Sequence, residues 1–308
     1  MTARIGDGAR AGGAAAGDTA RFEAERRRLV GLAYRLLGSV SDAEDVVQEA
    51  WLRWQRADRE AIEEPAAWLT TVTSRIGLDR LRARQRDRAE YVGPWLPEPI
   101  LTAPDDTDPA RHAELSDSLT TAFLLLLEQL TPTERLVLLL ADVFDQPFDE
   151  IAKILGKSPP ACRQLASRAR RKLRETEPPP ARPDPATLAV AAAFINAALQ
   201  GDQRTVLRLL SPDVVLVSDG GPHTHAARRP VVGASRVGRF VTNIAKRVSP
   251  DVAAEPCRIN GTPGFVVRSG GAPLLTQAFE VVDGRITRIE IVSNPSKLTA
   301  LAHSVELA

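Results

Sequence analysis

Apolar residues recur at helical spacing in three successive stretches near the start of the chain, 22–37, 41–54 and 65–88. Gly38 follows the first stretch, at a position where a glycine commonly ends a helix. The three stretches together predict a compact helical domain over about residues 21–90.

The stretch 41–54 combines an apolar stripe with an acidic face. Ser41 and Glu44 have the spacing of a capping box, which predicts that the helix is capped at Ser41. Residues three and four apart are neighbours on a helix, so several polar side chains share one face. This face consists of Asp45, Gln48, Glu49 and Leu52, with Asp42 and Glu44 in the first turn. It fits either a solvated helix surface or a surface that docks a protein partner.

A second set of helical stretches covers about 113–175, after a linker over 91–112 that carries five prolines. Within 149–174 the pattern is that of a helix-turn-helix. Gly156 is expected to end the first helix, and Ser158 to cap the second.

The pattern changes again after 176–185, a spacer with five prolines in ten residues. Helical stretches come first in the remaining segment, 186–308, and alternating strands with turn signals follow. The Asp-Gly pair within 282–285 predicts a hairpin turn. We expect an α+β domain with an antiparallel sheet. The fold class is therefore multidomain, with two all-α domains followed by an α+β domain, and 1–20 is expected to be a disordered tail.

Composition excludes several classes of protein. Among 308 residues, 44% are hydrophobic and 26% charged, which is typical of globular proteins. The two cysteines, Cys162 and Cys257, are far apart and do not suggest a disulfide framework, which favours a reducing, cytoplasmic location. No apolar run approaches the ~18 residues of a membrane span, so no membrane partner is expected. The net charge is only +1, so the positions of the charges matter more than their sum.

Arginines gather at the end of the third helical stretch. Between 75 and 88 there are six arginines against two aspartates. Arginine binds phosphate and stacks on bases, and with Trp68 on the same helix the pattern suits single-stranded or melting DNA. Trp68 is also consistent with a core position. The candidate DNA-binding residues are Trp68, Arg75, Arg80, Arg82 and Arg84.

The second helix of the helix-turn-helix pattern has no acidic residue between 159 and 174. Cys162 falls on its apolar face and is interpreted as a small core residue. Arginine and glutamine are the side chains that most often pair with guanine and adenine in the major groove. The candidate base- and phosphate-contacting residues are Ser158, Arg163, Gln164, Ser167, Arg168 and Arg171.

In this order, the acidic-faced helix, the Trp/Arg helix, the linker and the basic helix-turn-helix resemble extracytoplasmic-function (ECF) sigma factors, over about residues 21–175. Residues 65–84 resemble the family's region for the −10 promoter element, and residues 130–174 resemble its region for the −35 element. WLPEP at 95–99 and NPSKL at 294–298 are similar to motifs of the sigma-J-like group, which carries a C-terminal SnoaL-like (NTF2-like) cone. The group also has an Asp-Gly-Gly-Gly-basic motif, of which only the first three residues, 219–221, are present here.

The resemblance implies roles for the candidate residues. The acidic face would dock on core RNA polymerase, the Trp/Arg helix would bind the −10 strand of promoter DNA, and the helix-turn-helix would read the −35 element. The motifs of the group imply interdomain contacts through which the C-terminal domain controls the sigma activity. They comprise Trp95, Leu96, Pro97, Glu98, Pro99, Asp219, Gly220, Gly221, Asn294, Pro295, Lys297 and Leu298. Lys297 is expected to pair with an acid of the sigma domains or of the WLPEP linker.

Two alternatives of a different class remain. One is a helix-turn-helix repressor that senses a small ligand in the C-terminal cone, and such a repressor needs no polymerase dock. The other is an isomerase or hydrolase, because SnoaL-like domains elsewhere often use an Asp and a His. Asp219, His223 and His225 lie close together in the sequence, but two histidines and one acid make a poor zinc site. We therefore expect no catalytic residue, no metal and no cofactor.

Overall fold

A computed structural model of the chain describes residues 8–87, 91, 93–102, 120–175, 186–222, 224, 226–247, 249 and 251–302. It divides into two compact units. Unit 1 combines residues up to 83 with 132–169, and unit 2 combines 84–131 with 170–306. The long helices α3 (Pro65–Asp87) and α8 (Pro159–Glu175) each have residues in both units.

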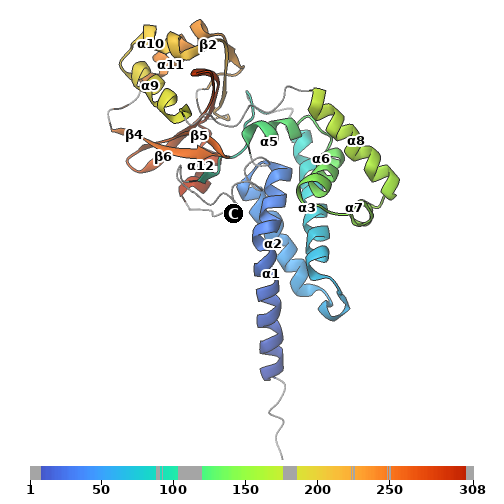
Figure 1. Ribbon diagram of the computed structural model, residues 1–308. Coiled ribbons are helices and arrows are strands. Elements are labelled where there is room, and N and C mark those ends of the chain that lie inside the picture. The colour runs from blue at the N-terminus through green and yellow to red at the C-terminus, as the bar shows by residue number, and fades with distance from the viewer. Residues whose placement is uncertain are drawn as a thin grey trace, which may run out of the picture. The chain divides into compact units, whose positions relative to one another are not determined.

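Three helices form the N-terminal part of unit 1: α1 (Gly8–Leu37), α2 (Val40–Arg56) and α3 (Pro65–Asp87), with a short 3-10 turn, η1 (Arg59–Ala61), between the last two (Figure 1). Their apolar stripes face one another. Leu29, Leu36, Trp54 and Leu69 are fully buried, as the helical periodicity predicts.

Two details near the helix starts differ from the prediction. Helix α1 begins at Gly8, within the segment 1–20 that was predicted to be disordered; the alanines of this stretch have the highest helix propensity, which favours the helix although Gly12, Gly13 and Gly17 oppose it. Helix α2 is capped by Ser39 and not by Ser41: the Ser39 side chain accepts a hydrogen bond from the Asp42 amide. Gly38 ends α1 in a left-handed conformation, as predicted. The next residue, Ser39, has an extended backbone and is therefore the one that caps α2.

The rest of unit 1 consists of α6 (Pro132–Leu138), a π-helical segment η3 (Leu139–Val143), α7 (Phe148–Leu155) and α8 (Pro159–Glu175). Gly156 ends α7 with a φ of 63°, and the Ser158 side chain accepts a hydrogen bond from the Ala161 amide at the start of α8. The helix-turn-helix is thus confirmed with the predicted stop and cap. Cys162 is buried with Ala166 and Ala169 on the inner face of α8.

Unit 2 is built on a seven-stranded sheet in the order β1-β4-β5-β6-β7-β2-β3. The strands are β1 (Leu101–Thr102), β2 (Leu210–Asp219), β3 (Val231–Val232), β4 (Val252–Ile259), β5 (Thr262–Ser269), β6 (Ala272–Val282) and β7 (Arg285–Val292). The short strand β1 comes from the segment that follows WLPEP. It pairs with β4, so this segment is part of the sheet.

The sheet is mixed, which corrects the expectation of a purely antiparallel sheet. β2 pairs with β7 in parallel, and every other neighbouring pair is antiparallel. A parallel pair between strands far apart in sequence leaves no hairpin signal, so the sequence pattern did not reveal it. The predicted hairpin between β6 and β7 is confirmed, since Asp283 and Gly284 both have the positive φ that a tight turn requires.

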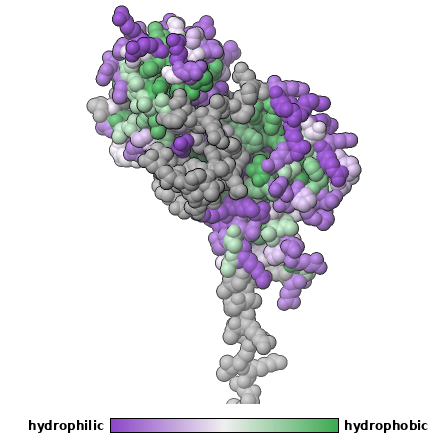
Figure 2. Space-filling model, in the orientation of Figure 1, coloured by the Kyte–Doolittle hydropathy of each residue, from purple (hydrophilic) through white to green (hydrophobic). Residues whose placement is uncertain are grey.

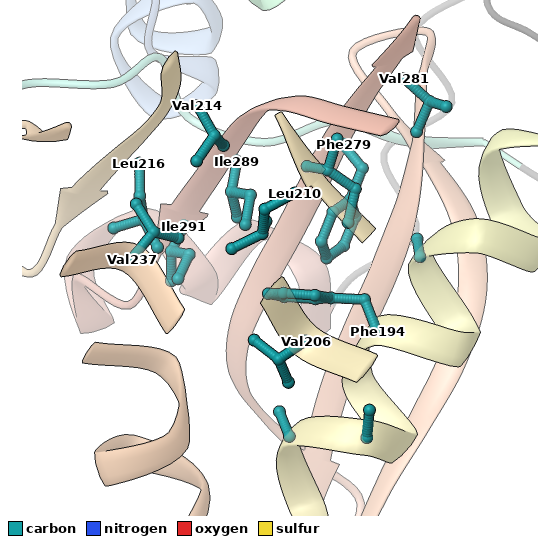
Figure 3. Close-up of a cluster of buried hydrophobic side chains, with 14 of the residues drawn as sticks. Phe194, Val206, Leu210, Val214, Leu216, Val237, Phe279, Val281, Ile289 and Ile291 are labelled. Carbon is teal, nitrogen blue, oxygen red and sulfur yellow. The ribbon is translucent and has the colours of Figure 1, made fainter. Parts of the chain in front are cut away.

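Helices α9 (Thr187–Leu199), α10 (Gln203–Leu209) and α11 (Ala234–Ala245) cover one face of the sheet (Figure 1). Figure 3 shows the apolar core between them, where Phe194 of α9 faces Phe279 of β6, with ring centroids 6.2 Å apart. The other face carries two smaller apolar clusters that include Leu96, Leu298 and Leu125. Leu125 belongs to α5 (Thr121–Leu127), and Leu298 to α12 (Pro295–Leu298), which is followed by the 3-10 turn η4 (Thr299–Ala302). Two helical parts followed by an α+β domain confirm the predicted fold class.

Among the helices that the structure describes, none is long and apolar enough to cross a membrane.

Candidate functional site

The acidic face of α2 is accessible in unit 1. Asp45 and Gln48 are exposed, and Asp42 and Glu49 are partly exposed. The face also carries Leu52, which is 43% exposed although it is a large apolar residue. Acidic side chains around an exposed leucine form a surface that suits a partner with basic and apolar groups.

Arg80 of α3 lies against this acidic face. Its Nη1 donates a hydrogen bond to Oδ2 of Asp45 at 3.1 Å, and its Nη2 lies 4.0 Å from Oε2 of Glu49. Glu49 also accepts a hydrogen bond from Arg53, one helical turn further along α2. One candidate DNA-binding arginine is therefore in an ion pair with two members of the acidic face.

The remaining candidates on α3 have different surroundings. Trp68 is half-buried, and its ring packs on that of Trp54 with centroids 5.6 Å apart, so part of the ring belongs to the core. Arg82 is exposed and forms an ion pair with Asp79 of its own helix. In unit 2, the guanidinium of Arg84 lies 4.9 Å from the centre of the Trp95 ring. The candidates on α3 thus have different partners within their own units.

Arg75 binds the end of another helix in unit 1. Its Nε donates to the carbonyl oxygen of Ile154 at 3.0 Å, and its Nη2 donates to that of Lys153 at 2.9 Å. Both carbonyls lie in the last turn of α7, where helices leave carbonyl oxygens unpaired and carry partial negative charge. Arg75 therefore stabilises the C-terminus of the first helix of the helix-turn-helix.

A second arginine makes the reciprocal contact. Nη2 of Arg135, on α6, donates to the carbonyl oxygen of Arg35 near the end of α1, at 2.9 Å. Both arginines are buried, and burial lowers the pKa of the Arg35 guanidinium to about 10. This pair was not predicted, because no sequence pattern identifies an arginine that binds the end of a distant helix.

The exposed side of α8 is strongly basic. All six predicted base- and phosphate-contacting residues, Ser158, Arg163, Gln164, Ser167, Arg168 and Arg171, are exposed. Arg163 lies 5.7 Å from the centre of the Phe148 ring, which orients it from the preceding helix. Two exposed arginines at 170 and 174 extend the same charge towards the end of the helix. The geometry matches that of a recognition helix, whose first turns contact bases and whose flank contacts phosphates.

The three motif segments of unit 2 meet at one buried carboxylate, Asp219, which is fully buried at the end of β2. Its Oδ2 accepts hydrogen bonds from the Lys297 ammonium at 2.6 Å and from the Leu96 amide at 2.8 Å. Its Oδ1 accepts from the Tyr91 hydroxyl at 2.6 Å and from the Gly221 amide at 3.1 Å. We name these residues, with Trp95 and Asn294, the Asp219 cluster.

The Asp219 cluster contacts the linker at Trp95 and Leu96. The Lys297 ammonium also donates to the carbonyl oxygen of Leu96, and it lies 4.3 Å from the centre of the Trp95 ring. Burial and the hydrogen bond to Asp219 raise the pKa of the Tyr91 phenol. Residues 96–99 of WLPEP are all buried in unit 2. A buried ion pair with every oxygen satisfied holds its partners in a single geometry.

The two glycines after Asp219 are required by space. A Cβ on Gly220 would lie 2.6 Å from Cβ of Ala226, and one on Gly221 would lie 2.5 Å from Nδ2 of Asn294. Gly221 also has a φ of +60°. Asn294 in turn accepts a hydrogen bond from the Ser296 amide and donates one to the Tyr91 hydroxyl, so it caps α12 while contacting the linker. Pro295 follows as the first residue of that helix.

A second anchor binds the linker further along. Oδ1 of Asn260 accepts a hydrogen bond from the Ile100 amide at 2.9 Å, and its Nδ2 donates to the Thr121 hydroxyl at 3.3 Å. Asn260 thus joins the linker and α5 to the turn between β4 and β5. Tyr91 and Asn260 were both missed by the sequence analysis. The Asn-Gly pair at 260–261 was an available hairpin signal, whereas Tyr91 carries none.

Comparison with known proteins identifies the two helical parts. Residues 21–87 match the family model described as sigma-70 region 2, and residues 120–173 match the one described as sigma-70, region 4. The chain is 41% identical over 295 residues to the ECF RNA polymerase sigma factor SigJ of Mycobacterium tuberculosis, covering 92% of this chain and 93% of that protein. The chain belongs to the ECF sigma factor family.

The similarity of this sigma factor to SigJ extends to the structure and to a second relative. The crystal structure of SigJ from M. tuberculosis superimposes with a TM-score of 0.70 at 38% identity, covering 94% of this chain and all of that one. The probable ECF sigma factor SigI of the same organism is 34% identical, covering 92% of this chain and 95% of its own length. These relatives span the α+β domain as well as both sigma regions.

Within this sigma factor, the expected partner of Lys297 was wrong in one respect. Its acid is Asp219 of the same domain, and the WLPEP linker contributes a carbonyl oxygen instead of a carboxylate. His223 and His225 lie outside the described residues. Among the residues that are described, no three potential metal ligands lie close enough together to hold an ion.

Proposed function

We propose that this chain is an ECF sigma factor that binds core RNA polymerase through the acidic face of α2. Residues Asp42, Asp45, Gln48 and Glu49 dock the polymerase. The α3 residues Trp68, Arg75, Arg80, Arg82 and Arg84 bind the −10 strand, and the exposed residues of α8 read the −35 groove. This activity belongs in the cytoplasm, where transcription takes place.

The observation that favours this function over a helix-turn-helix repressor is the accessible acidic face with Leu52 at its edge. A repressor needs a basic recognition helix but no acidic docking surface. The chain has both, and the relatives that match it over nine-tenths of its length are sigma factors.

The C-terminal domain controls the sigma activity in cis in this proposal. The linker between the two sigma regions enters the sheet as β1, and the Asp219 cluster and Asn260 bind it. α5, where the region 4 match begins, is held by the same anchor. A domain that holds the linker limits how far the two sigma regions can separate, and separation is what −10 and −35 recognition on one promoter requires.

We propose further that this domain does not catalyse a reaction. Asp219, which the isomerase hypothesis would use as a base, accepts hydrogen bonds from four donors and is fully buried. An acid held in this way has no oxygen available to take a proton from a substrate. The interior between sheet and helices is filled by apolar side chains such as Phe194, Phe279 and Ile289 (Figure 3).

Charge reversal tests the docking surface. We expect Asp45→Lys with Glu49→Lys to reduce the affinity for core polymerase at least tenfold, while the affinity for isolated −35 duplex DNA is unchanged. The matched control is Glu23→Lys, an exposed acid on α1 outside the acidic face. Equal loss of core affinity in the control, or no loss in the double variant, would exclude docking through this face.

Promoter-specific transcription tests the control in cis. Complete removal of 186–308 would also strip the packing partners of α5 and the linker, so point variants of the Asp219 cluster in the full chain are better probes. We expect Tyr91→Phe, which removes one hydrogen bond to Asp219, to change transcript yield with saturating core polymerase. If neither this variant nor Asn260→Ala changes the yield at any temperature at which the chain is folded, the C-terminal domain has no such role.

A further inference from the structure

A basic surface lies on the helical layer of the C-terminal domain, far in sequence from the sigma regions. From Gly220 to Pro250 the chain contains no aspartate or glutamate, although acids make up about one residue in eight of the whole sequence. The same stretch contains six arginines and lysines, at 228, 229, 236, 239, 246 and 247. A solvated helix surface usually mixes both signs of charge, so this segregation requires an explanation.

The basic residues of α11 form one stripe. Arg236 and Arg239 lie on α11, and Lys246 is its C-cap residue, so the three follow the helical spacing of three and seven residues. Arg247 comes directly after Lys246. All four are exposed, whereas Val237 and Thr242 face the core. We call these four residues the α11 basic stripe. Over ten residues a helix rises about 15 Å, which is the axial length of about four base pairs.

The neighbouring helix adds to this charge. α10 carries exposed arginines at 204 and 208, and it packs so closely on α11 that a Cβ on Gly238 would lie 3.2 Å from Leu207. Hydrophilic side chains line the surface over α10 and α11 at the top of Figure 2. Within the described part of the chain, no member of the α11 basic stripe forms an ion pair. The positive charge is therefore available to a ligand.

The covalent connection favours DNA as that ligand. α8, which carries the proposed −35 recognition surface, ends at Glu175, and the C-terminal domain begins at Ala186. Ten residues span at most about 36 Å even when fully extended, which is the length of roughly ten base pairs. When α8 is bound to the −35 element, duplex DNA is at high effective concentration around the C-terminal domain. Arginine-rich surfaces bind its phosphates through charge and directed hydrogen bonds.

We propose that the α11 basic stripe binds the phosphate backbone of the promoter duplex next to the −35 element. This inference rests on the proposed sigma function, since α8 must first be on the −35 element. The stripe contacts phosphates and not base edges, so it adds affinity that does not depend on sequence. It makes the C-terminal domain a third DNA-contacting part of the chain, beside the two sigma regions.

Holoenzyme assembled from core polymerase and the full-length chain tests the proposal on two promoter fragments. One fragment extends about 20 base pairs upstream of the −35 element, and the other ends at its upstream edge. The variant is R236Q/R239Q, and the control is R258Q/R285Q, which removes two positive charges from the sheet of the same domain. On the long fragment we expect the variant to lower affinity about tenfold and to flatten the slope of log K against log salt by about 2. The control is expected to behave as the unmodified chain does.

The short fragment and the footprint test the proposed upstream contact. On the short fragment the variant and the unmodified chain should bind equally, because the upstream phosphates are missing. Hydroxyl-radical protection upstream of the −35 element that persists in R236Q/R239Q would overturn the proposal. Loss of transcription with unchanged DNA affinity would also overturn it and would indicate an acidic protein surface as the partner. A chain that fails to bind core polymerase or −35 DNA would instead refute the sigma function itself.

Discussion

The side chain of Arg75 donates hydrogen bonds to the backbone carbonyl oxygen of Ile154, at 3.0 Å, and to that of Lys153. Arg75 is a proposed −10 contact, and Ile154 lies in the last turn of α7, the first helix of the proposed −35 reader. Arg135 makes the reciprocal contact with the end of α1. In unit 1 each sigma region thus supplies an arginine to a helix C-terminus of the other, so binding of Arg75 to DNA requires this contact to open.

Replacement of Arg75 by alanine should loosen α7. Hydrogen bonds to a charged donor contribute about 1.5 kcal/mol or more, so we expect the amides in the last turn of α7 to exchange with solvent roughly tenfold faster. Hydrogen exchange followed by mass spectrometry measures this. Arg82→Ala is the control, because Arg82 is exposed and pairs with Asp79 of its own helix. Equal exchange in the two variants would show that the Arg75 contact does not stabilise α7.

Loss of the ammonium at position 297 should destabilise unit 2 strongly. Lys297→Met leaves the buried carboxylate of Asp219 without its counter-charge, and breaking a buried pair in this way typically costs about 3–5 kcal/mol. We expect a lower urea midpoint and faster proteolysis of the linker around 91–101. Lys157→Met, at an exposed lysine of unit 1, should leave both unchanged. A Lys297→Met chain as stable as the control would mean that the pair contributes nothing.

Much of this fold could be predicted from local signals. Gly38, Gly156, Ser158 and the Asp-Gly turn at 283–284 all act through the backbone next to them, so the pattern alone places them correctly. The prediction of Ser41 as the cap of α2 was wrong, because both Ser39 and Ser41 precede the apolar stripe. The left-handed Gly38 decides between them, since it ends α1 directly before Ser39.

The buried site could be predicted only in part. The resemblance selected Asp219, Lys297 and Leu96, but neither a motif nor a periodicity in the sequence shows which of them are in contact, since Asp219 is 123 residues from Leu96 and 78 from Lys297. The parallel pairing of β2 with β7 was invisible for the same reason. Tyr91 lies in a proline-rich stretch without periodicity, and only the folded sheet brings its hydroxyl to Asp219.

Alanine at Gly221 should cost more than alanine at Gly284. Both glycines have positive φ, so both substitutions carry the backbone strain of about 1–2 kcal/mol. At Gly284 a Cβ meets no atom within 4 Å, whereas at Gly221 it would meet the Asn294 side chain at 2.5 Å. Displacing Asn294 breaks its bond to Tyr91 and the cap of α12. We expect Gly221→Ala to lower the free energy of unfolding by at least 1 kcal/mol more than Gly284→Ala, as measured by urea denaturation. Equal losses would show that Asn294 moves without cost.

Glu280 should make the stability of the C-terminal domain depend on pH near neutrality. It lies on β6 opposite Arg288 of β7, and the Arg288 guanidinium donates to Glu290 at 2.7 Å. Burial, followed by the negative charge of Glu290, raises the pKa of Glu280 from 4.5 to about 7, against the opposing effect of Arg288. Arg288 therefore lies near two carboxylates, Glu280 and Glu290. In the folded chain, burial and the charge of Glu290 favour the protonated form of Glu280.

The direction of the effect follows from proton counting. Between pH 4.5 and about 7 the folded chain retains a proton on Glu280 that the unfolded chain has lost, so the free energy of unfolding falls as pH rises through this window. The fall amounts to roughly 2–3 kcal/mol. Glu280→Gln should remove it and leave a flatter profile in urea titrations from pH 5 to 8. Glu255→Gln, an exposed residue of the same sheet that pairs with Arg268, should retain the slope of the unmodified chain. If Glu280→Gln and Glu255→Gln gave the same dependence of unfolding free energy on pH, a group other than Glu280 would carry the proton that the folded chain retains.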